Sequence, residues 1–123
     1  MFILIAGPYR SGTGDAPDRM AANLKRLEEA SWPLFRAGHV PMIGEWVAVP
    51  IWQAAGGARV GDALYNEVFH PVAGRLIKLV DAILRLPGDS TGADNDVRLA
   101  QERGIPVYYR LEDIPGCENG AVA

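Results

Sequence analysis

The sequence predicts an α/β fold, a Rossmann-like (flavodoxin-like) three-layer sandwich around a mainly parallel sheet of four or five strands. Short apolar runs without polar alternation are typical of strands that are buried on both faces of a parallel sheet. Between these runs, apolar residues recur at spacings of three and four, which indicates amphipathic helices. For a chain of 123 residues, we expect one domain over residues 1–116 and a loose tail over residues 117–123.

Four apolar runs are expected to form the strands. The first run contains two Ile residues and ends at Gly7 and Pro8, which are typical of a turn. The expected strands are Phe2–Ala6, His39–Ile43, Val80–Leu86 and Pro106–Tyr109. The stretch GEWVAVPIWQAAGG, residues 44–57, contains two Trp residues and has no clear period, so no element is assigned to it.

Helical periods occupy much of the remaining chain. Pro17 suits a first helical turn and Gly38 suits a C-terminal stop. Pro33 is expected to kink or interrupt the helix between them, and Pro71 is expected to open a separate helical piece. The expected helices cover residues 17–38, 58–69, 71–78 and 93–103.

Composition and charge exclude several classes of function. The net charge is −3 with scattered Lys and Arg, whereas a surface for a nucleic acid polymer would show a basic patch. The apolar part of the start, MFILIAGPYR, is about six residues long, too short for a signal peptide or a membrane span. The single Cys117 has no disulfide partner, which fits a cytoplasmic location. His39 and His70 lack the spacing of metal ligands, so we interpret both as structural and expect no metal site.

Two loops are rich in glycine and polar residues, and both follow predicted strands. Parallel strands bring their carboxyl ends to one edge of the sheet, where ligands of such folds bind. In the first loop, GPYRSGTGD, Gly7 lets backbone amides approach a ligand and Arg10 adds a positive charge that suits a phosphate or carboxylate. The alternative is a flexible turn with a solvated Arg. The loop is neither a Walker loop nor GxGxxG, which disfavours an NAD-binding domain.

The second loop, PGDSTGADND, contains the pattern S-x-G-x-x-x-D formed by Ser90, Gly92 and Asp96. Gly92 would expose amides at the start of the following helix, and Ser90 would supply a hydroxyl. The helix dipole would keep Asp96 ionised, as a nucleophilic carboxylate requires. The alternative is that Ser90, Thr91 or Asp94 caps the helix while Asp96 supports the dipole.

Four segments resemble the nucleoside 2-deoxyribosyltransferase-like superfamily. They are IAGPYR, VDAILRLPG, the S-x-G loop with an acidic residue four positions after its Gly, and A-x-x-x-G-x-P-V. The chain is most similar to the small uncharacterised bacterial members and to the deoxynucleoside 5'-monophosphate N-glycosidases. The resemblance spans residues 2–109, although the match is poor over residues 44–70.

The resemblance implies cleavage or transfer at the N-glycosidic bond of a nucleoside or nucleoside monophosphate. In that family a carboxylate attacks the anomeric carbon and forms a glycosyl-enzyme, which water or a second base then resolves without a metal or redox cofactor. Asp96 stands where the family has Glu, one methylene longer. The alternative is therefore a non-catalytic nucleotide- or nucleoside-binding module that kept the pocket but lost the family's side chain.

The resemblance also implies roles for other loop residues. Ser90 and Gly92 match phosphate-contacting positions, and Arg10 would contact a phosphate or the sugar. Tyr9 matches a position near the base or the nucleophile. Asp81 matches an acidic residue at the start of the third strand, with the alternative that it only holds the turn into that strand.

The middle of the chain leaves further alternatives. Glu45 follows the second strand and would serve either as a second carboxylate of the site or as a solvated loop acid. Trp46 and Trp52 would stack on a base, complete the core or form a subunit interface. With Tyr65 and Phe69 they predict a homodimer or homotetramer, because aromatic residues are enriched in interface cores. The family resemblance implies active sites completed by a neighbouring chain.

Overall fold

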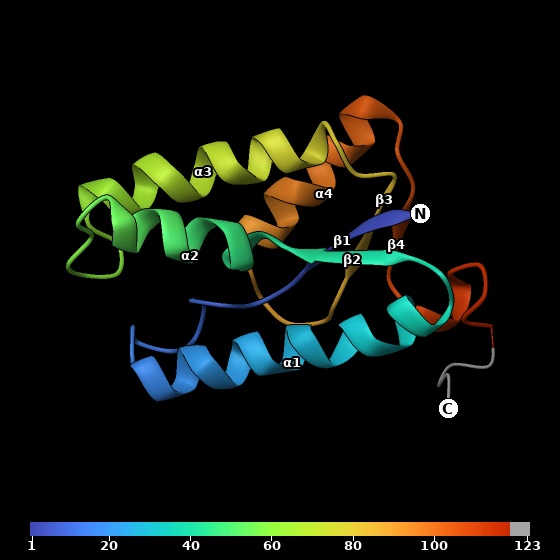
Figure 1. Ribbon diagram of the computed structural model, residues 1–123, viewed down its shortest axis with the longest axis horizontal. Coiled ribbons are helices and arrows are strands. Elements are labelled where there is room, and N and C mark those ends of the chain that lie inside the picture. Colours follow the sequence, from blue (N-terminus) through green and yellow to red (C-terminus); the bar gives the residue numbers. More distant parts are fainter. Residues whose placement is uncertain (119–123) are drawn as a thin grey trace.

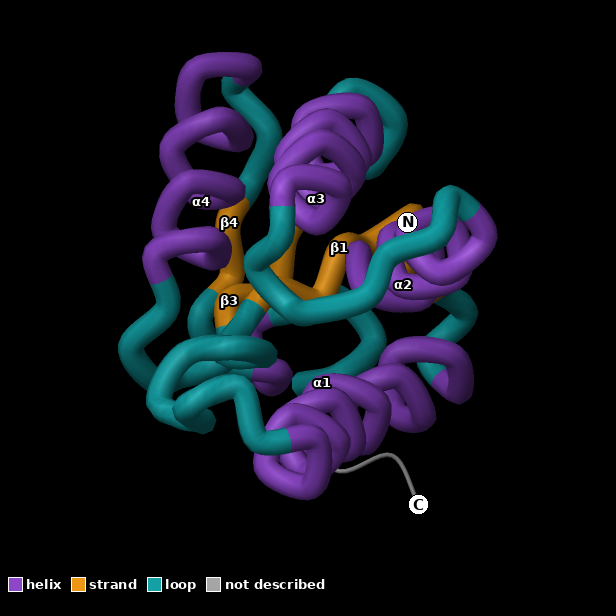
Figure 2. Tube along the Cα trace, turned by 90° about the vertical axis from the view of Figure 1, so that its left-hand side faces the viewer, coloured by secondary structure: helices purple, strands orange, loops and turns teal. Residues whose placement is uncertain are grey.

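The computed structural model describes residues 1–118 and contains a four-stranded, all-parallel sheet with strand order β2-β1-β3-β4. Helix α1 covers one face of this sheet, and α2, α3 and α4 cover the other face (Figure 1 and Figure 2). The elements are β1 (Phe2–Ala6), α1 (Pro17–Arg36), β2 (Val40–Ile43), α2 (Gly44–Ala54), α3 (Ala63–Ile77), β3 (Ala82–Arg85), α4 (Thr91–Arg103), β4 (Val107–Tyr108) and a 3₁₀ turn, η1 (Leu111–Asp113). The predicted Rossmann-like three-layer fold is confirmed.

Both faces of the sheet are apolar, which explains the absence of polar alternation in the strands. Ile3 and Ile5 of β1 pack on the α1 side, together with Leu27 from that helix. Leu4 and Ala6 point to the opposite side and pack with residues of α2, α3 and α4. These four of the five β1 side chains are at most 5% exposed, and their burial contributes about 1.5–3 kcal/mol for each large residue.

The strands lie where the apolar runs predict them, although β2, β3 and β4 are shorter than the runs. His39 precedes β2 instead of starting it, and its buried ring joins two distant segments. Its Nδ1 lies 2.7 Å from the α-amino nitrogen of Met1, and its Nε2 lies 2.7 Å from the carbonyl oxygen of Pro115. This ring therefore has the structural role that the sequence predicts for it.

The helices differ from the prediction at their proline residues. α1 continues through Pro33 and α3 continues through Pro71, so the expected interruption and the expected separate helical piece are both wrong. Each proline is followed by a buried residue, Leu34 or Val72, that packs into the core. Because packing of an apolar face supplies most of a helix's stability, it offsets the lost backbone hydrogen bond.

The unassigned stretch after β2 forms α2, which begins directly where the strand ends. The end of the described chain packs under α1: Ile114 and Cys117 are at most 1% exposed and belong to the core on that side. The ordered core thus reaches one residue past the predicted domain boundary, and residues 119–123 of the predicted tail lie outside the described residues. Within residues 1–118, no helix combines the length and apolarity that a membrane crossing requires.

Gly7 provides a test of the packing between the two central strands and α1. A Cβ at this position would lie 2.8 Å from Leu27 Cδ2 and 3.3 Å from Leu86 Cβ. We expect Gly7→Ala to lower the free energy of unfolding by about 1–3 kcal/mol, as overpacking of a core does. Chemical denaturation measures this change.

Gly74 is the matched control, because it lies inside α3 and a Cβ added there would meet open space. Gly74→Ala is expected to keep or raise stability by up to about 1 kcal/mol through helix propensity. Equal stability of Gly7→Ala and the wild type would contradict the close packing.

Candidate functional site

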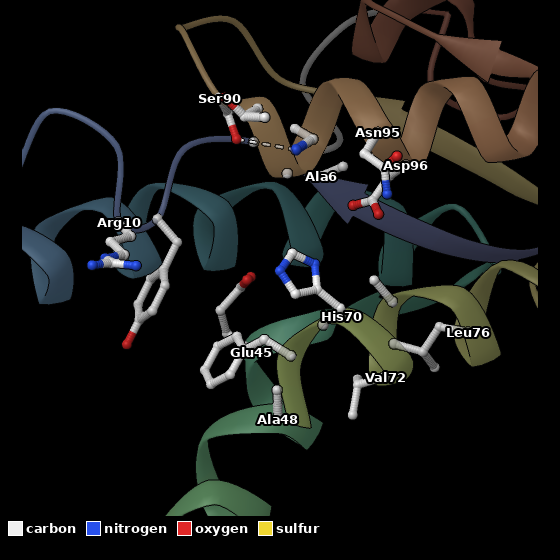
Figure 3. Close-up of a pocket in the computed structure, with 18 of the residues that line it drawn as sticks. Ala6, Arg10, Glu45, Ala48, His70, Val72, Leu76, Ser90, Asn95 and Asp96 are labelled. Carbon is white, nitrogen blue, oxygen red and sulfur yellow. Dashed lines mark hydrogen bonds between the residues drawn. The ribbon is translucent and has the colours of Figure 1, made fainter. Parts of the chain in front are cut away.

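A cavity of about 530 Å³ opens at the carboxyl ends of β1 and β3. At this point the strand order reverses, because β1 leads through α1 to β2 on one side and β3 leads through α4 to β4 on the other. Ligands of open α/β sheets bind at such a reversal, and the volume suits a small organic ligand. Its lining includes the sequence-predicted residues Gly7, Tyr9, Arg10, Glu45, Ser90, Gly92 and Asp96 (Figure 3).

Ser90 and Gly92 form the start of α4 at the cavity. Ser90 is the N-cap: its Oγ accepts a hydrogen bond from the Ala93 backbone N–H at 3.1 Å. Of the three capping candidates, Ser90 is therefore confirmed, and Thr91 and Asp94 are wrong, because the helix begins at Thr91. The first amides of a helix have no acceptor within it, and open space surrounds Gly92, so a ligand can reach them.

Asp94 is instead paired with Arg85, a residue that sequence reasoning missed. Arg85 is 9% exposed, and its guanidinium donates to Asp94 Oδ1 at 2.9 Å, to the Gly88 carbonyl oxygen at 3.0 Å and to the Leu86 carbonyl oxygen. The signal was present: Arg85 is a lone charge inside the apolar run AILRL. Its contacts hold the loop between β3 and α4 in shape.

Asp96 projects its carboxylate into the cavity from α4 (Figure 3). Burial, and next the negative charge of Glu45, raise the pKa of this carboxyl to about 7, while Arg85 lowers it in part. The expectation that the helix dipole keeps Asp96 ionised at neutral pH is corrected by this value. The residue is the sixth of α4, and the dipole acts mainly within the first turn.

Glu45 lies opposite, in the first turn of α2, and its carboxylate also projects into the cavity (Figure 3). Burial raises the pKa of the Glu45 carboxyl to about 7. The alternative of a solvated loop acid is therefore wrong. Two carboxyl groups from segments 51 positions apart, Glu45 and Asp96, share one space and have similar proton affinities.

His70 of α3 also lines the cavity, and its ring projects toward the same space as the two carboxylates (Figure 3). The interpretation of this residue as structural is not supported, since its ring makes no hydrogen bond or ion pair with residues 1–118. Its position inside a helix gave no signal in the sequence, because the pattern alone does not show which helix face meets the cavity. An imidazole there can bind a ligand or exchange a proton with it.

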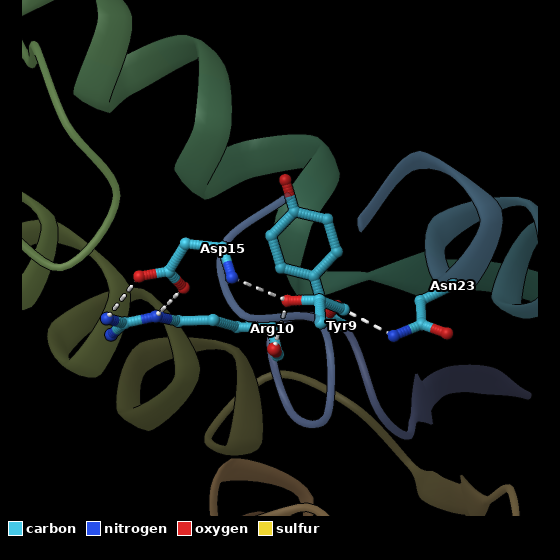
Figure 4. A network of polar contacts seen from close by, with 5 residues as sticks. Tyr9, Arg10, Asp15 and Asn23 are labelled. Atoms are coloured by element: carbon cyan, nitrogen blue, oxygen red, sulfur yellow. Dashed lines mark hydrogen bonds and ion pairs between the residues drawn. The ribbon is translucent and has the colours of Figure 1, made fainter. Parts of the chain in front are cut away.

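The loop after β1 is held by a polar network (Figure 4). Arg10 donates to both Asp15 carboxylate oxygens, at 2.7 and 3.1 Å, and its guanidinium carbon lies 5.4 Å from the centre of the Tyr65 ring. Gly61 has a φ of +81°, which favours glycine, and a Cβ there would lie 2.3 Å from Arg10 Nη2. Arg10 therefore fastens the loop after β1 to the segment before α3.

Tyr9 lies on the same loop beside the carboxyl pair. Its carbonyl oxygen accepts a hydrogen bond from Asn23 Nδ2 at 2.9 Å, which ties the loop to α1 (Figure 4). Burial raises the pKa of the Tyr9 hydroxyl, and the charge of Glu45 raises it too. The hydroxyl is therefore protonated at neutral pH and available as a hydrogen-bond donor.

Asp81 lies outside the cavity, at the amino end of β3. Its Oδ2 accepts a hydrogen bond from the Phe2 backbone N–H at 2.7 Å, and its own N–H donates to the Phe2 carbonyl oxygen at 2.7 Å. These contacts match the alternative of holding the strand entry. A catalytic role for Asp81 does not fit, because the cavity lies at the opposite ends of the strands.

The aromatic residues of the middle segment are mainly internal. Trp52 donates from Nε1 to Asp62 Oδ1 at 3.1 Å and packs edge-on against Tyr65. Tyr65 and Phe69 stack with ring centres 3.8 Å apart, and both line the cavity. Within residues 1–118, no group of three or more His, Cys, Asp and Glu side chains is placed to hold a metal ion.

The raised pKa of Asp96 predicts how stability depends on pH. An unfolded Asp has a pKa near 4, so between about pH 4 and pH 7 the folded protein binds more protons than the unfolded chain. The contribution of Asp96 to the free energy of unfolding therefore falls as pH rises through this window and is constant above it. We expect Asp96→Asn to be more stable than the wild type at about pH 8, by on the order of 1 kcal/mol, and similar at about pH 4.

Thermal or chemical unfolding at the two pH values measures this difference. Asp89→Asn is the matched control, an exposed carboxylate on the same loop, and is expected to change stability little at either pH. A destabilised Asp96→Asn at about pH 8 would show that Asp96 supports the fold in its charged form.

Comparisons with known proteins add no related sequence to the geometry of the site. Neither the models of known protein families nor the curated proteins contain a match to this chain. The site is therefore defined by two facing carboxyl groups, an imidazole and a helix start gathered at one edge of a parallel sheet.

Proposed function

We propose that the protein cleaves or transfers at the N-glycosidic bond of a nucleoside or nucleoside monophosphate, with Asp96 as the nucleophile. The observation that carries the proposal is the pair of carboxyl groups, Asp96 and Glu45, that enter one cavity from different helices. Enzymes that break glycosidic bonds use two carboxyl groups, one as nucleophile and one as acid and base. The sequence resemblance independently points to the same position, Asp96, as the nucleophile.

The cavity offers a different surface to each part of such a ligand. The sugar would lie between Asp96 and Glu45. The base would lie toward the stacked rings of Tyr65 and Phe69, which bind flat apolar groups. The 5' end of the sugar would lie at the start of α4, where free amides and a hydroxyl suit an oxygen-rich or anionic group.

In the first step, a carboxylate oxygen of Asp96 attacks the anomeric carbon. The bond from that carbon to the base nitrogen breaks, and its electron pair stays with the base. The protonated Glu45 carboxyl donates its proton to the leaving base. This step produces a glycosyl ester on Asp96 and an ionised Glu45.

In the second step, water attacks the anomeric carbon and the ester bond to Asp96 breaks. Ionised Glu45 accepts a proton from this water, so both carboxyl groups return to their starting states. A second base in place of water would give transfer instead of hydrolysis. The ring of His70 is placed to hold the attacking molecule by a hydrogen bond.

The surroundings of Asp96 and Glu45 act on the protons that this cycle moves. Both carboxyl groups have a pKa of about 7, and the two negative charges repel each other. Arg85 lowers the pKa of Asp96, whereas no cation is among the causes acting on Glu45. Arg85 therefore supports the ionised form of Asp96 that the first step requires, while the charge of Glu45 opposes it and is removed when Glu45 holds the proton.

A non-catalytic nucleotide- or nucleoside-binding module is the second candidate. It is favoured by the shorter side chain of Asp96, since a displacement of about 1 Å at a reacting atom can cost on the order of a hundredfold in rate. Binding of nucleosides without release of base by the wild-type protein would support this candidate over the enzyme.

We also propose that the protein works in the cytoplasm as a homodimer. The cytoplasmic location is supported by the absence of a cysteine pair in the sequence. The dimer is supported by aromatic side chains that remain exposed in the single chain.

The assignment of the nucleophile is tested by replacing Asp96. Asp96→Asn is expected to lower base release by at least about a thousandfold while ligand binding is kept, because the amide cannot form the ester. Asp96→Glu is expected to retain or raise activity, since it restores the family's longer side chain. Chromatographic detection of free base over a panel of nucleosides and their 5'-monophosphates measures the rates, with Asp89→Asn as a control of unchanged activity. Full turnover by Asp96→Asn would exclude the mechanism.

The role of Glu45 as the proton donor is tested by comparing substrates whose leaving base does or does not need a proton. Glu45→Gln is expected to slow base release from ordinary nucleosides by about a hundredfold or more, because the base must then leave without a proton. An N7-methylated purine nucleoside releases a neutral base without protonation, so its first step is expected to survive the substitution.

The dependence on pH supplies the control for this assignment. Wild-type activity is expected to fall above about pH 7 as Glu45 loses its proton, and Glu45→Gln is expected to lack this alkaline decline. Equal losses on both kinds of substrate, with an unchanged pH profile, would contradict the acid role.

A further inference from the structure

Helix α1 carries two large aromatic side chains on its outer surface. Trp32 is 56% exposed and Phe35 is 63% exposed. Their rings stack on each other with centres 6.1 Å apart, and the Arg36 guanidinium carbon lies 5.5 Å from the centre of the Trp32 ring. Stacked, water-facing aromatic residues flanked by arginine are typical of the centre of a protein–protein interface.

The aromatic surface continues from α1 onto α2. Trp46 is 38% exposed, and its Nε1 donates to Glu28 Oε2 of α1 at 2.8 Å. The α1 surface, defined by Trp32, Phe35 and Trp46, is therefore flanked by an acid, Glu28, on one side and a base, Arg36, on the other. Trp32 and Phe35 lie on α1, on the opposite face of the sheet from α3 and α4, whereas Trp46 follows the cavity residue Glu45 on α2.

The charges on this surface complement themselves. Glu28 and Arg36 each lie four positions from Trp32 along the helix. If two copies of α1 pack antiparallel around a two-fold axis at Trp32, the position four before the axis meets the position four after it. Each Glu28 then faces an Arg36 of the other copy, twice in one interface. Such self-complementarity is what a two-fold interface requires, whereas another protein would not need it.

A partner that adds a strand to the sheet is disfavoured at this side of the molecule. β2 is the edge strand next to α1, and Pro41 lies at its second position. Proline lacks the N–H that a strand ladder uses, and its presence on an edge strand prevents further pairing. Contact on this side therefore depends on side chains such as those of the α1 surface.

We infer that the α1 surface is the interface for a second copy of this chain, with Trp32 on the two-fold axis and Glu28 paired with the Arg36 of the other copy. The inference centres the dimer contact on α1, across the sheet from α3 and α4, whereas the family resemblance implies active sites completed by a neighbouring chain. It replaces the expectation that Trp52, Tyr65 and Phe69 form the interface, since these side chains pack within the chain. It does not depend on the proposed reaction.

Charge reversal with rescue tests this interface. Analytical ultracentrifugation of the wild type is expected to show a dimer at micromolar concentration. Glu28→Arg and Arg36→Glu are each expected to weaken the dimer at least about a hundredfold, because each places like charges together twice. The double variant Glu28→Arg/Arg36→Glu is expected to restore the dimer, and Trp32→Ala to abolish it.

Leu79→Glu is the matched control, since Leu79 is 66% exposed after α3, on the opposite layer, and its variant is expected to remain dimeric. Far-UV circular dichroism and thermal unfolding show that each variant is folded. A monomeric wild type would overturn the inference and leave the surface to a different protein. A dimer that survives Trp32→Ala would overturn it too, as would a double variant that stays monomeric while folded.

Discussion

Strands β1 and β3 must be covered on both faces, and this requirement organises the rest of the molecule. Their side chains point alternately to the α1 side and to the side of α2, α3 and α4, and nearly all are buried. The connections that supply the two covers leave the central strands in opposite directions. A hollow forms where they diverge, at the carboxyl ends of β1 and β3. The candidate site is thus a consequence of how the sheet is buried.

Within this hollow, the pKa values of the carboxyl groups depend on where the fold places them more than on their neighbours in the sequence. Asp96 comes from α4 and Glu45 from α2, and the negative charge of Glu45 acts on Asp96. Arg85 reaches from behind the loop and acts on one carboxyl group only. Both carboxyl groups therefore have a pKa of about 7, which lets either one gain or lose a proton near neutral pH.

Much of the fold follows from the sequence, because apolar runs and helical spacing report burial directly. The four strands lie where those runs predict them, and two loops that line part of the cavity were identified by their glycine and acid content. The helix at Gly44–Ala54 was missed, because it is apolar on most sides and shows no period. The continuity of α1 and α3 through their proline residues was missed. The cost of a proline in a helix can be read from the sequence, whereas the tertiary packing that offsets it cannot.

The site was predicted less completely than the fold, for a related reason. Residue types and spacing locate Asp96, but its pKa depends on burial and on Glu45, which is distant in the chain. His70 carries no local signal, so only the packing of α3 reveals it, whereas Arg85 stands out as a lone charge in an apolar run but its partners are tertiary. Asp81 resembled a site residue by sequence yet lies at the other end of its strand.

The bidentate contact between Arg10 and Asp15 has a consequence for the selection of ligands. An anionic ligand that binds this guanidinium through Nε and Nη2 must displace the Asp15 carboxylate that these atoms already hold. The exchange replaces one ion pair by another, so its net free energy is the difference between two similar terms. A neutral ligand leaves the pair in place and keeps the loop fastened over Tyr65. Discrimination at this mouth of the cavity therefore depends on shape and hydrogen bonding more than on the charge of the ligand.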